Sequence, residues 1–268
     1  MALTAPQPVL FTVEFRRKMA QLTQTEREEW LASLAERRRR EGGEHASGAL
    51  SQELREVARG CRLPLVDAID HQLGPFDARH LAALLEVPRE RFVRPCDLER
   101  SAEDTPLPLD DAGLATVSAP HAYLLSYRLL GLAPGDALVE LGSGSGYGAA
   151  LAAFIVGPTG GVLTFEIDEA LAGWAARTLA DEPNVEVVHG DAVTSAPRWG
   201  TANKVVATFA VSALPGPWLD ALPEGGKLVA PVGPREREQR LVLALRQRGR
   251  IVESEHGAVR YVKNRSTR

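Results

Sequence analysis

The chain has 268 residues, of which 44% are hydrophobic and 25% are charged, a composition typical of a soluble globular protein with a full core. The net charge of -4 gives no general attraction to phosphates, so we expect no nucleic-acid partner, and the two cysteines lack the spacing of a disulfide framework or a metal site. Because no apolar run approaches the roughly 20 residues of a membrane span, we expect a cytoplasmic protein without membrane contact.

Residues 1–62 are predicted to form a helical N-terminal extension, followed by a catalytic domain over residues 63–268. Apolar residues recur at helical spacing within the charged first part of this extension. They are Phe15, Met19, Leu22, Trp30, Leu31 and Leu34. The basic run at 37–40 is interpreted as a solvated helix end rather than a patch for nucleic acid. The extension is either a stabilising cap or a module that recruits a substrate or partner.

Two short helices are predicted next, over residues 65–73 and 77–87. Asp77 is a suitable N-cap for the second, and Pro88 marks its end. A further helix is predicted over residues 119–132, because its apolar run ends at a Pro-Gly pair.

From this point strands and helices alternate along the chain. Strands are predicted at 136–144, 160–168, 184–191, 203–210, 226–233 and 240–247, with a last one near 258–263. Helices are predicted at 147–157 and 169–181. This alternation indicates a doubly wound, Rossmann-like α/β fold with a largely parallel sheet and helices on both faces.

The first of these strands runs into a glycine turn, VELGSGSGYG, at residues 139–148. In an open α/β sheet the loop after the first strand lines the ligand crevice, and Gly142, Gly144 and Gly146 allow close approach to its backbone. A phosphate-binding P-loop would need a Gly-Lys pair, which is absent, and the dinucleotide fingerprint would place a glycine where Tyr147 stands. A nucleotide phosphate is therefore not expected, and an NAD-dependent oxidoreductase is disfavoured.

Acidic residues at the strand ends indicate what binds instead. Glu140 can face an ammonium group, Glu166 can accept hydrogen bonds from ribose hydroxyls, and Asp191 can accept from an adenine amine beside the backbone of Ala192. S-adenosylmethionine fits these groups better than NAD, whereas a plain strand-to-helix connection is the alternative without a ligand. The predicted cofactor-binding residues are Glu140, Gly142, Ser143, Gly144, Ser145, Gly146, Glu166, Ile167, Asp191 and Ala192.

From Leu65 to Val262 the chain resembles the protein-L-isoaspartate O-methyltransferases, which methylate the stray carboxylate of isomerised aspartate in damaged proteins. The similar segments are DARHLAALLEVPRERFVRP, TVSAPHA, VELGSGSGYGAALAAFIVG, GGVLTFEIDEAL, VEVVHGDA and LPEGGKLVAPVG. The VPRERFV, SAPH and PVG pieces are more specific than a generic methyltransferase loop. The resemblance implies a carboxyl O-methyltransferase that uses S-adenosylmethionine and acts on a peptide or protein with a free carboxylate. Because that carboxylate is already ionised at neutral pH, no general base is needed.

In that family a Thr-Ile-Ser-Ala-Pro-His segment lies over the cofactor and holds the substrate. The resemblance implies catalytic roles for Ser118, as hydroxyl donor to the carboxylate, and for Thr116 and His121. It also implies a substrate-binding role for Val117, Ala119 and Pro120. The structural alternatives are that Ser118 is an N-cap and that His121 is a packed or capping group.

Several positions depart from the family pattern. Leu114 and Ala115 replace a polar residue ahead of the Ser-Ala-Pro signature, Asn203 and Lys204 replace Tyr-Asp, and Ala192 replaces a glycine. These departures leave open a specialised enzyme for one dedicated peptide or small metabolite. A third possibility is a cofactor-binding protein without transferase activity.

Overall fold

The structure, a computed structural model, describes residues 48–234, 238–263 and 265. The predicted apolar stripe from Phe15 to Leu34 and the basic run at 37–40 lie outside these residues. No helix within the described ranges is long and apolar enough to cross a membrane.

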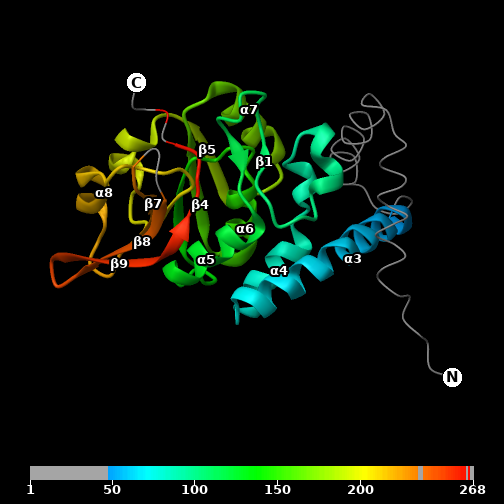
Figure 1. Cartoon of the computed structure of the whole chain (residues 1–268), viewed down its shortest axis with the longest axis horizontal. Helices are drawn as coiled ribbons and strands as arrows, with labels where there is room; N and C mark the ends of the chain where they lie inside the picture. The colour runs from blue at the N-terminus through cyan, green and yellow to red at the C-terminus, as the bar shows by residue number, and fades with distance from the viewer. Residues whose placement is uncertain (1–47, 235–237, 264, 266–268) are drawn as a thin grey trace.

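The helices and strands follow one another along the chain as Figure 1 shows. Helices α3 to α8 are Gly48–Leu73, Ala78–Glu86, Pro120–Leu130, Tyr147–Val156, Glu169–Thr178 and Gly216–Ala221. Short 3-10 helices η1 to η4 are Arg89–Arg91, Pro95–Arg100, Ala192–Thr194 and Ala196–Arg198. Strands β1 to β9 are Leu107–Pro108, Thr116–Val117, Ala137–Leu141, Gly161–Glu166, Val185–His189, Lys204–Ala207, Lys227–Val232, Gln239–Gln247 and Arg250–Val259.

Within the described residues, seven of these strands form one sheet in the order β5-β4-β3-β6-β7-β8-β9. The strands from β5 to β7 are parallel, and β8 and β9 add an antiparallel hairpin. The predicted doubly wound α/β fold is therefore confirmed. Strand order reverses between β3 and β6, which is where a ligand crevice is expected beyond the carboxyl ends of the strands.

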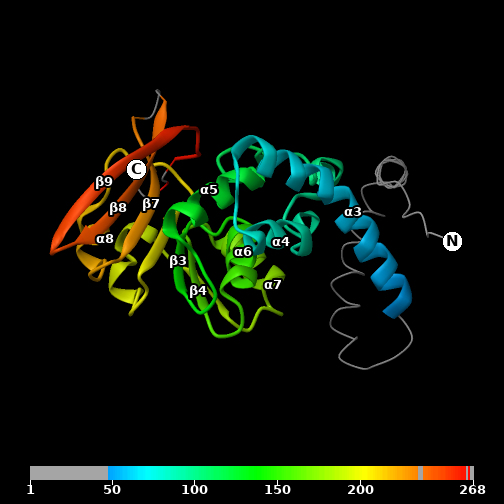
Figure 2. The same ribbon diagram turned by 90° about the horizontal axis from the view of Figure 1, so that it is seen from below.

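The central strands are buried on both faces, and their alternate side chains enter two separate cores. On β3, Leu138 packs with helices α4 to α7, whereas Val139 packs with α8 and the residues around η3 and η4. Figure 2 shows α4, α6 and α7 gathered beside β3 and β4, with α8 beside β7 and β8. Near-continuous apolar strands such as these are what a sheet covered on both faces requires.

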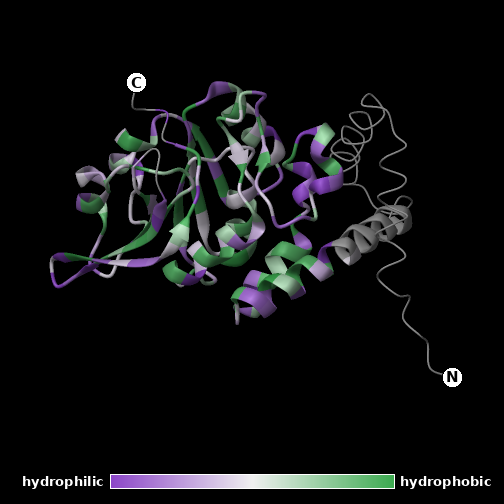
Figure 3. Ribbon diagram, viewed as in Figure 1, coloured by the Kyte–Doolittle hydropathy of each residue, from purple (hydrophilic) through white to green (hydrophobic). Residues whose placement is uncertain are grey.

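The C-terminal edge of the sheet differs from the predicted one. The last strand is Arg250–Val259 rather than residues 258–263. Of the predicted residues, Ala258 and Val259 pair with β8, and Lys263 makes an isolated bridge to Ala210. The strand was missed because most of its residues are exposed, so it carries no alternating apolar signal; Figure 3 shows the tip of the β8–β9 hairpin as hydrophilic. Arg248 and Gly249 both have positive φ, the backbone that a two-residue hairpin turn requires.

The predicted helix at 65–73 is the end of the 26-residue helix α3, which starts at Gly48. It passes the predicted boundary at residue 62 without a break, so the division into extension and catalytic domain stays a prediction. Arg62 ties α3 to the chain that follows, donating to Leu85 O at 2.6 and 2.9 Å and pairing with Glu90 at 2.9 Å. The second predicted helix is α4, and Asp77 caps it as expected by accepting from Arg79 N at 2.8 Å.

Candidate active site

An open cavity lies at the carboxyl ends of β3, β4 and β6, where the strand order reverses. Six of the residues predicted from sequence line it: Thr116, Gly142, Gly144, Glu166, Ile167 and Ala192. The lining is completed by Leu114, Ala115, Phe165, Leu171, Thr208, Phe209, Val262, Lys263 and Arg265. The sequence-based expectation of a crevice beyond the first strand is thus met by an observed cavity.

The glycine loop leaves its backbone open toward this cavity. Gly142 has φ +99°, and a Cβ there would lie 2.4 Å from Thr208 Oγ1 and 2.9 Å from Phe209 Cδ1. Gly146, with φ +95°, is pressed against Leu179 of the chain after α7. These positions need glycine because both the backbone conformation and the space exclude a side chain.

Glu166 ends β4 and closes one side of the cavity. Its carboxylate accepts from Gly144 N at 2.8 Å and from Asp168 N at 3.1 Å. Burial raises the pKa of Glu166, and these two N–H donors and the nearby Arg265 oppose the rise. A partly desolvated carboxylate fixed in this way is suited to accept hydrogen bonds from a diol.

Glu140 lies deeper than the cavity wall, because its side chain points beneath the start of α6. It is 1% exposed and accepts from Thr164 Oγ1 at 2.7 Å, and Thr164 in turn shares a 2.6 Å hydrogen bond with Ser143 Oγ. A Cβ on Gly148 would lie 2.0 Å from Glu140 Oε1, so glycine is needed above it. Burial raises the pKa of Glu140 to about 8, partly offset by the Thr164 hydroxyl.

The rest of the lining is largely apolar, and Ala192 belongs to the chain after β5. Asp191 accepts from Val193 N at 2.8 Å and so caps η3, which places Ala192 in the lining. Ile167 is 37% exposed at the mouth. Apolar side chains on both sides of a slot suit a planar aromatic base.

These groups fit S-adenosylmethionine. The slot beside Ile167 and Ala192 suits adenine, and Glu166 suits the ribose hydroxyls. Ser145 Oγ is buried and has no hydrogen-bond partner among the described residues, so a polar group in the glycine loop remains to be satisfied. No cluster of metal-ligating side chains occurs in the part of the chain that the structure describes.

The predicted substrate segment, residues 116–121, borders the same cavity through Thr116. Its backbone continues from β2 into α5, and Val117 and Ser118 are buried. Ala119 occupies the N-cap position and Pro120 opens the helix, and no side-chain hydrogen bond caps this end. The alternative that Ser118 is an N-cap is therefore wrong, and its hydroxyl is not used for capping.

His121 is held by a carboxylate from a preceding loop. Asp104 accepts from His121 N at 3.1 Å, and its other oxygen lies 2.8 Å from His121 Nδ1. Burial raises the pKa of Asp104, but the hydrogen bonds from His121 outweigh it and the net shift is downward. His121 does not line the cavity, so its predicted contact with substrate stays a prediction.

Three residues near the C-terminus, Val262, Lys263 and Arg265, line the cavity and were not predicted from the sequence. Val262 O accepts from Ala210 N at 2.7 Å. Arg265 then reaches Asp110 at 2.8 Å and Asp168 at 3.0 Å, and both ion pairs are half-buried. Thr208 and Phe209 also line the cavity and were not predicted from the sequence. They directly follow β6, where the strand order reverses, so their position after a predicted strand could have identified them.

A glycine loop after the first central strand, a carboxylate at the tip of the second and an apolar slot after the third define an S-adenosylmethionine-dependent methyltransferase. The sequence pattern described as "Protein-L-isoaspartate(D-aspartate) O-methyltransferase" matches residues 69–268. The chain belongs to this family.

Individual relatives agree with the family match. A protein-L-isoaspartate O-methyltransferase of Methanopyrus kandleri is 34% identical over 212 residues, which are 77% of this chain and 92% of the relative. One of Hyperthermus butylicus is 38% identical over 210 residues, covering 73% and 85%.

Solved structures resemble the fold as well. A protein-L-isoaspartate O-methyltransferase matches at 27% identity with a TM-score of 0.69, covering 75% of this chain and 65% of the other. A second, from Plasmodium falciparum in complex with S-adenosyl-L-homocysteine, matches at 22% identity and a TM-score of 0.67, covering 77% and 99%.

Proposed function

We propose that this enzyme transfers a methyl group from S-adenosylmethionine to the free carboxylate of isoaspartyl residues in proteins or peptides. The observation that supports this most directly is that Thr116, the first residue of the family's substrate segment, lines the same cavity as Gly142, Gly144 and Glu166. Residues predicted to bind the cofactor and a residue predicted to act on the substrate thus line one opening.

The cofactor supplies, when bound, an electrophilic methyl group on a sulfonium centre. Glu166 accepts hydrogen bonds from the ribose hydroxyls, and Asp191 with the backbone of Ala192 faces the adenine amine. The loop from Gly142 to Gly146 provides backbone for the rest of the ligand. Glu140 acts from below this loop, through Thr164 and Ser143.

The substrate side positions a group that is already reactive. An isoaspartyl carboxylate is ionised at neutral pH, so the enzyme needs to orient and desolvate it rather than deprotonate it. The Ser118 hydroxyl donates to this carboxylate, and Thr116 and Val117 shape the slot for the peptide backbone. Ala119 and Pro120 carry the chain into α5, and His121, fixed by Asp104, lies at the edge of the slot.

The test is tritiated methyl transfer to two peptides that differ only in an isoaspartyl or an aspartyl linkage. The wild type should label the isoaspartyl peptide alone, and Ser118→Ala should lower kcat/KM about 10- to 100-fold, because a hydrogen bond to a charged group contributes about 1.5–3 kcal/mol. S-adenosylmethionine affinity should not change. Ser126→Ala is the matched control, since Ser126 is a buried serine of α5 whose hydroxyl donates to Ala122 O. Equal labelling of the two peptides would contradict the proposal.

A second candidate is methylation of one dedicated peptide or small metabolite. It is favoured by Leu114, which is 58% exposed in the cavity lining and stands where the family carries a polar residue. Wild-type enzyme that binds S-adenosylmethionine but labels neither peptide, and instead labels one component of a mixture of acidic metabolites or short peptides, would support it over the first.

A further inference from the structure

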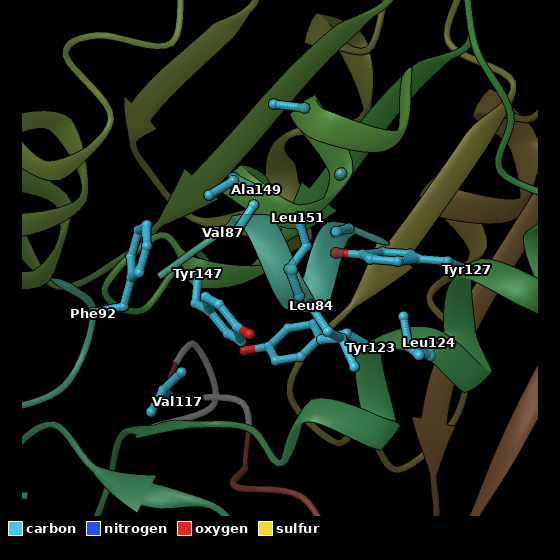
Figure 4. Close-up of a cluster of buried hydrophobic side chains, with 14 of the residues drawn as sticks. Leu84, Val87, Phe92, Val117, Tyr123, Leu124, Tyr127, Tyr147, Ala149 and Leu151 are labelled. Carbon is cyan, nitrogen blue, oxygen red and sulfur yellow. The ribbon is translucent and has the colours of Figure 1, made fainter. Parts of the chain in front are cut away.

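A buried guanidinium lies behind the substrate segment. Arg89 belongs to the 3-10 helix η1, and its side chain is 1% exposed, among the largest fully buried groups of the described chain. Its Cζ lies 5.9 Å from the centroid of the Tyr147 ring. Figure 4 shows Tyr147 together with Tyr123 and Phe92 in this part of the core.

Arg89 binds backbone carbonyls at two places. Its guanidinium donates to three residues of the loop at 101–105 and to the substrate segment. The acceptors are Ser101 O at 3.2 Å, Glu103 O at 2.8 Å, Thr105 O at 2.6 Å and Ser118 O at 3.1 Å. One guanidinium therefore joins the Ser118 peptide group to the loop that also carries Asp104, the partner of His121.

The charge of Arg89 lacks a direct counter-ion. Within the described residues no carboxylate accepts a hydrogen bond from it, whereas the other buried arginine, Arg62, pairs with Glu90 at 2.9 Å. Burial lowers the pKa of Arg89, yet a guanidinium stays charged at neutral pH. A buried cation is costly unless an anion or several dipoles compensate it. Here four carbonyl dipoles do so directly, and the Asp104 carboxylate attracts the charge through space without a hydrogen bond to it.

We infer that Arg89 is a positioning residue for the substrate, which fixes the Ser118 peptide group and supplies a buried positive charge beside the isoaspartyl carboxylate. This inference rests on the proposed function. The isoaspartyl carboxylate adds a second negative charge near Arg89, besides the Asp104 carboxylate, which makes no hydrogen bond to the guanidinium. Arg89 accordingly favours the charged substrate over an uncharged group of the same shape.

The experiment measures how strongly the enzyme, saturated with S-adenosylhomocysteine, binds two peptides by calorimetry. One carries the isoaspartyl carboxylate and the other a carboxamide in its place. The ratio of the two affinities measures the preference for the charged carboxylate. If Arg89 had a purely structural role, its substitution would weaken the binding of both peptides by the same factor. In Arg89→Met this ratio should fall about tenfold, the size expected for a charge acting over several ångströms in a protein.

Two further measurements keep the inference testable if Arg89→Met does not fold. Arg89→Lys keeps the charge without the planar fork, so absolute affinities should drop while the ratio stays within about threefold of the wild type. In the wild type the ratio should change less than about twofold between 50 and 500 mM salt, because a buried charge is screened little.

The matched control is Arg79→Met. Arg79 also donates to backbone carbonyls, at Ile155 and Phe154, but at the C-terminal end of α6. It should lower stability and leave the ratio unchanged. Three results would overturn the inference: Arg89→Met keeps the wild-type ratio of the two peptide affinities, Arg89→Lys abolishes it, or high salt abolishes it in the wild type. Failure of the wild type to bind either peptide would instead overturn the proposed function, and the inference with it.

Discussion

The two halves of the active site are built in different ways. The cofactor half consists of consecutive strand, loop and helix, and its contacts join the ends of neighbouring strands, as between Gly144 and Glu166. The substrate half is held from a distance, since Ser118 and His121 are fixed by Arg89, 29 residues earlier, and by Asp104, 17 residues earlier. The cofactor half is therefore built from neighbouring strand ends, whereas the substrate half depends on residues distant in sequence. Substitutions in one half should affect its own ligand and leave the other ligand's binding unchanged.

The largest effect is expected in the cofactor half, from Gly142→Ala. The new Cβ would lie 2.4 Å from Thr208 Oγ1 at φ +99°, so the loop must shift. We expect S-adenosylmethionine affinity to fall tenfold or more and the free energy of unfolding to fall about 1–3 kcal/mol, the usual cost of such strain. Calorimetry and denaturant unfolding measure both. Gly225→Ala, at φ +77° with open space around it, is the control that should keep cofactor binding.

The next effect, also in the cofactor half, is the pH dependence of the free energy of unfolding caused by Glu140. In the unfolded chain Glu140 ionises near pH 4.5, whereas in the folded protein its pKa is about 8. The unfolded state therefore loses its proton first, and the free energy of unfolding should fall as pH rises from about 4.5 to 8, by up to about 1.4 kcal/mol per pH unit. Glu140→Gln should flatten this slope in urea unfolding series. A variant with the wild-type slope would show that Glu140 is not the group responsible.

The smallest effect is expected in the substrate half, from Asp104→Asn. The carboxamide keeps an acceptor for His121 N but loses the charge that holds the ring. We expect kcat/KM for the isoaspartyl peptide to fall about two- to fivefold, since a partly exposed side-chain hydrogen bond contributes up to about 1 kcal/mol. S-adenosylmethionine affinity should stay the same. A joint loss of both would mean that the two halves are coupled through this loop.

The same contrast explains what sequence reasoning could find. Glu166 ends β4 and Ala192 comes shortly after β5, so the strand pattern placed both residues at the carboxyl edge of the sheet, where the cavity lies. Glu140 was predicted to face the ligand, and this contact stays a prediction; its side chain turns beneath α6, an orientation that strand position alone does not determine.

Contacts between residues distant in sequence could not be predicted from the local sequence pattern. Arg89 lies in a segment that resemblance identified, yet its four carbonyl partners are distant in sequence. Arg265 lines the cavity from a part of the chain that carries no periodic pattern. The predicted position of β9 was displaced by several residues because the strand is too exposed to show such a pattern.

The ion pairs of Arg265 with Asp110 and Asp168 make part of the cavity lining sensitive to salt concentration. Both pairs are partly open to solvent, with side-chain exposures of about 30%. Attraction between such charges decays over about 8 Å at physiological ionic strength and over less in concentrated salt. The two ion pairs that hold Arg265 in the cavity lining therefore weaken as the ionic strength of the solution rises.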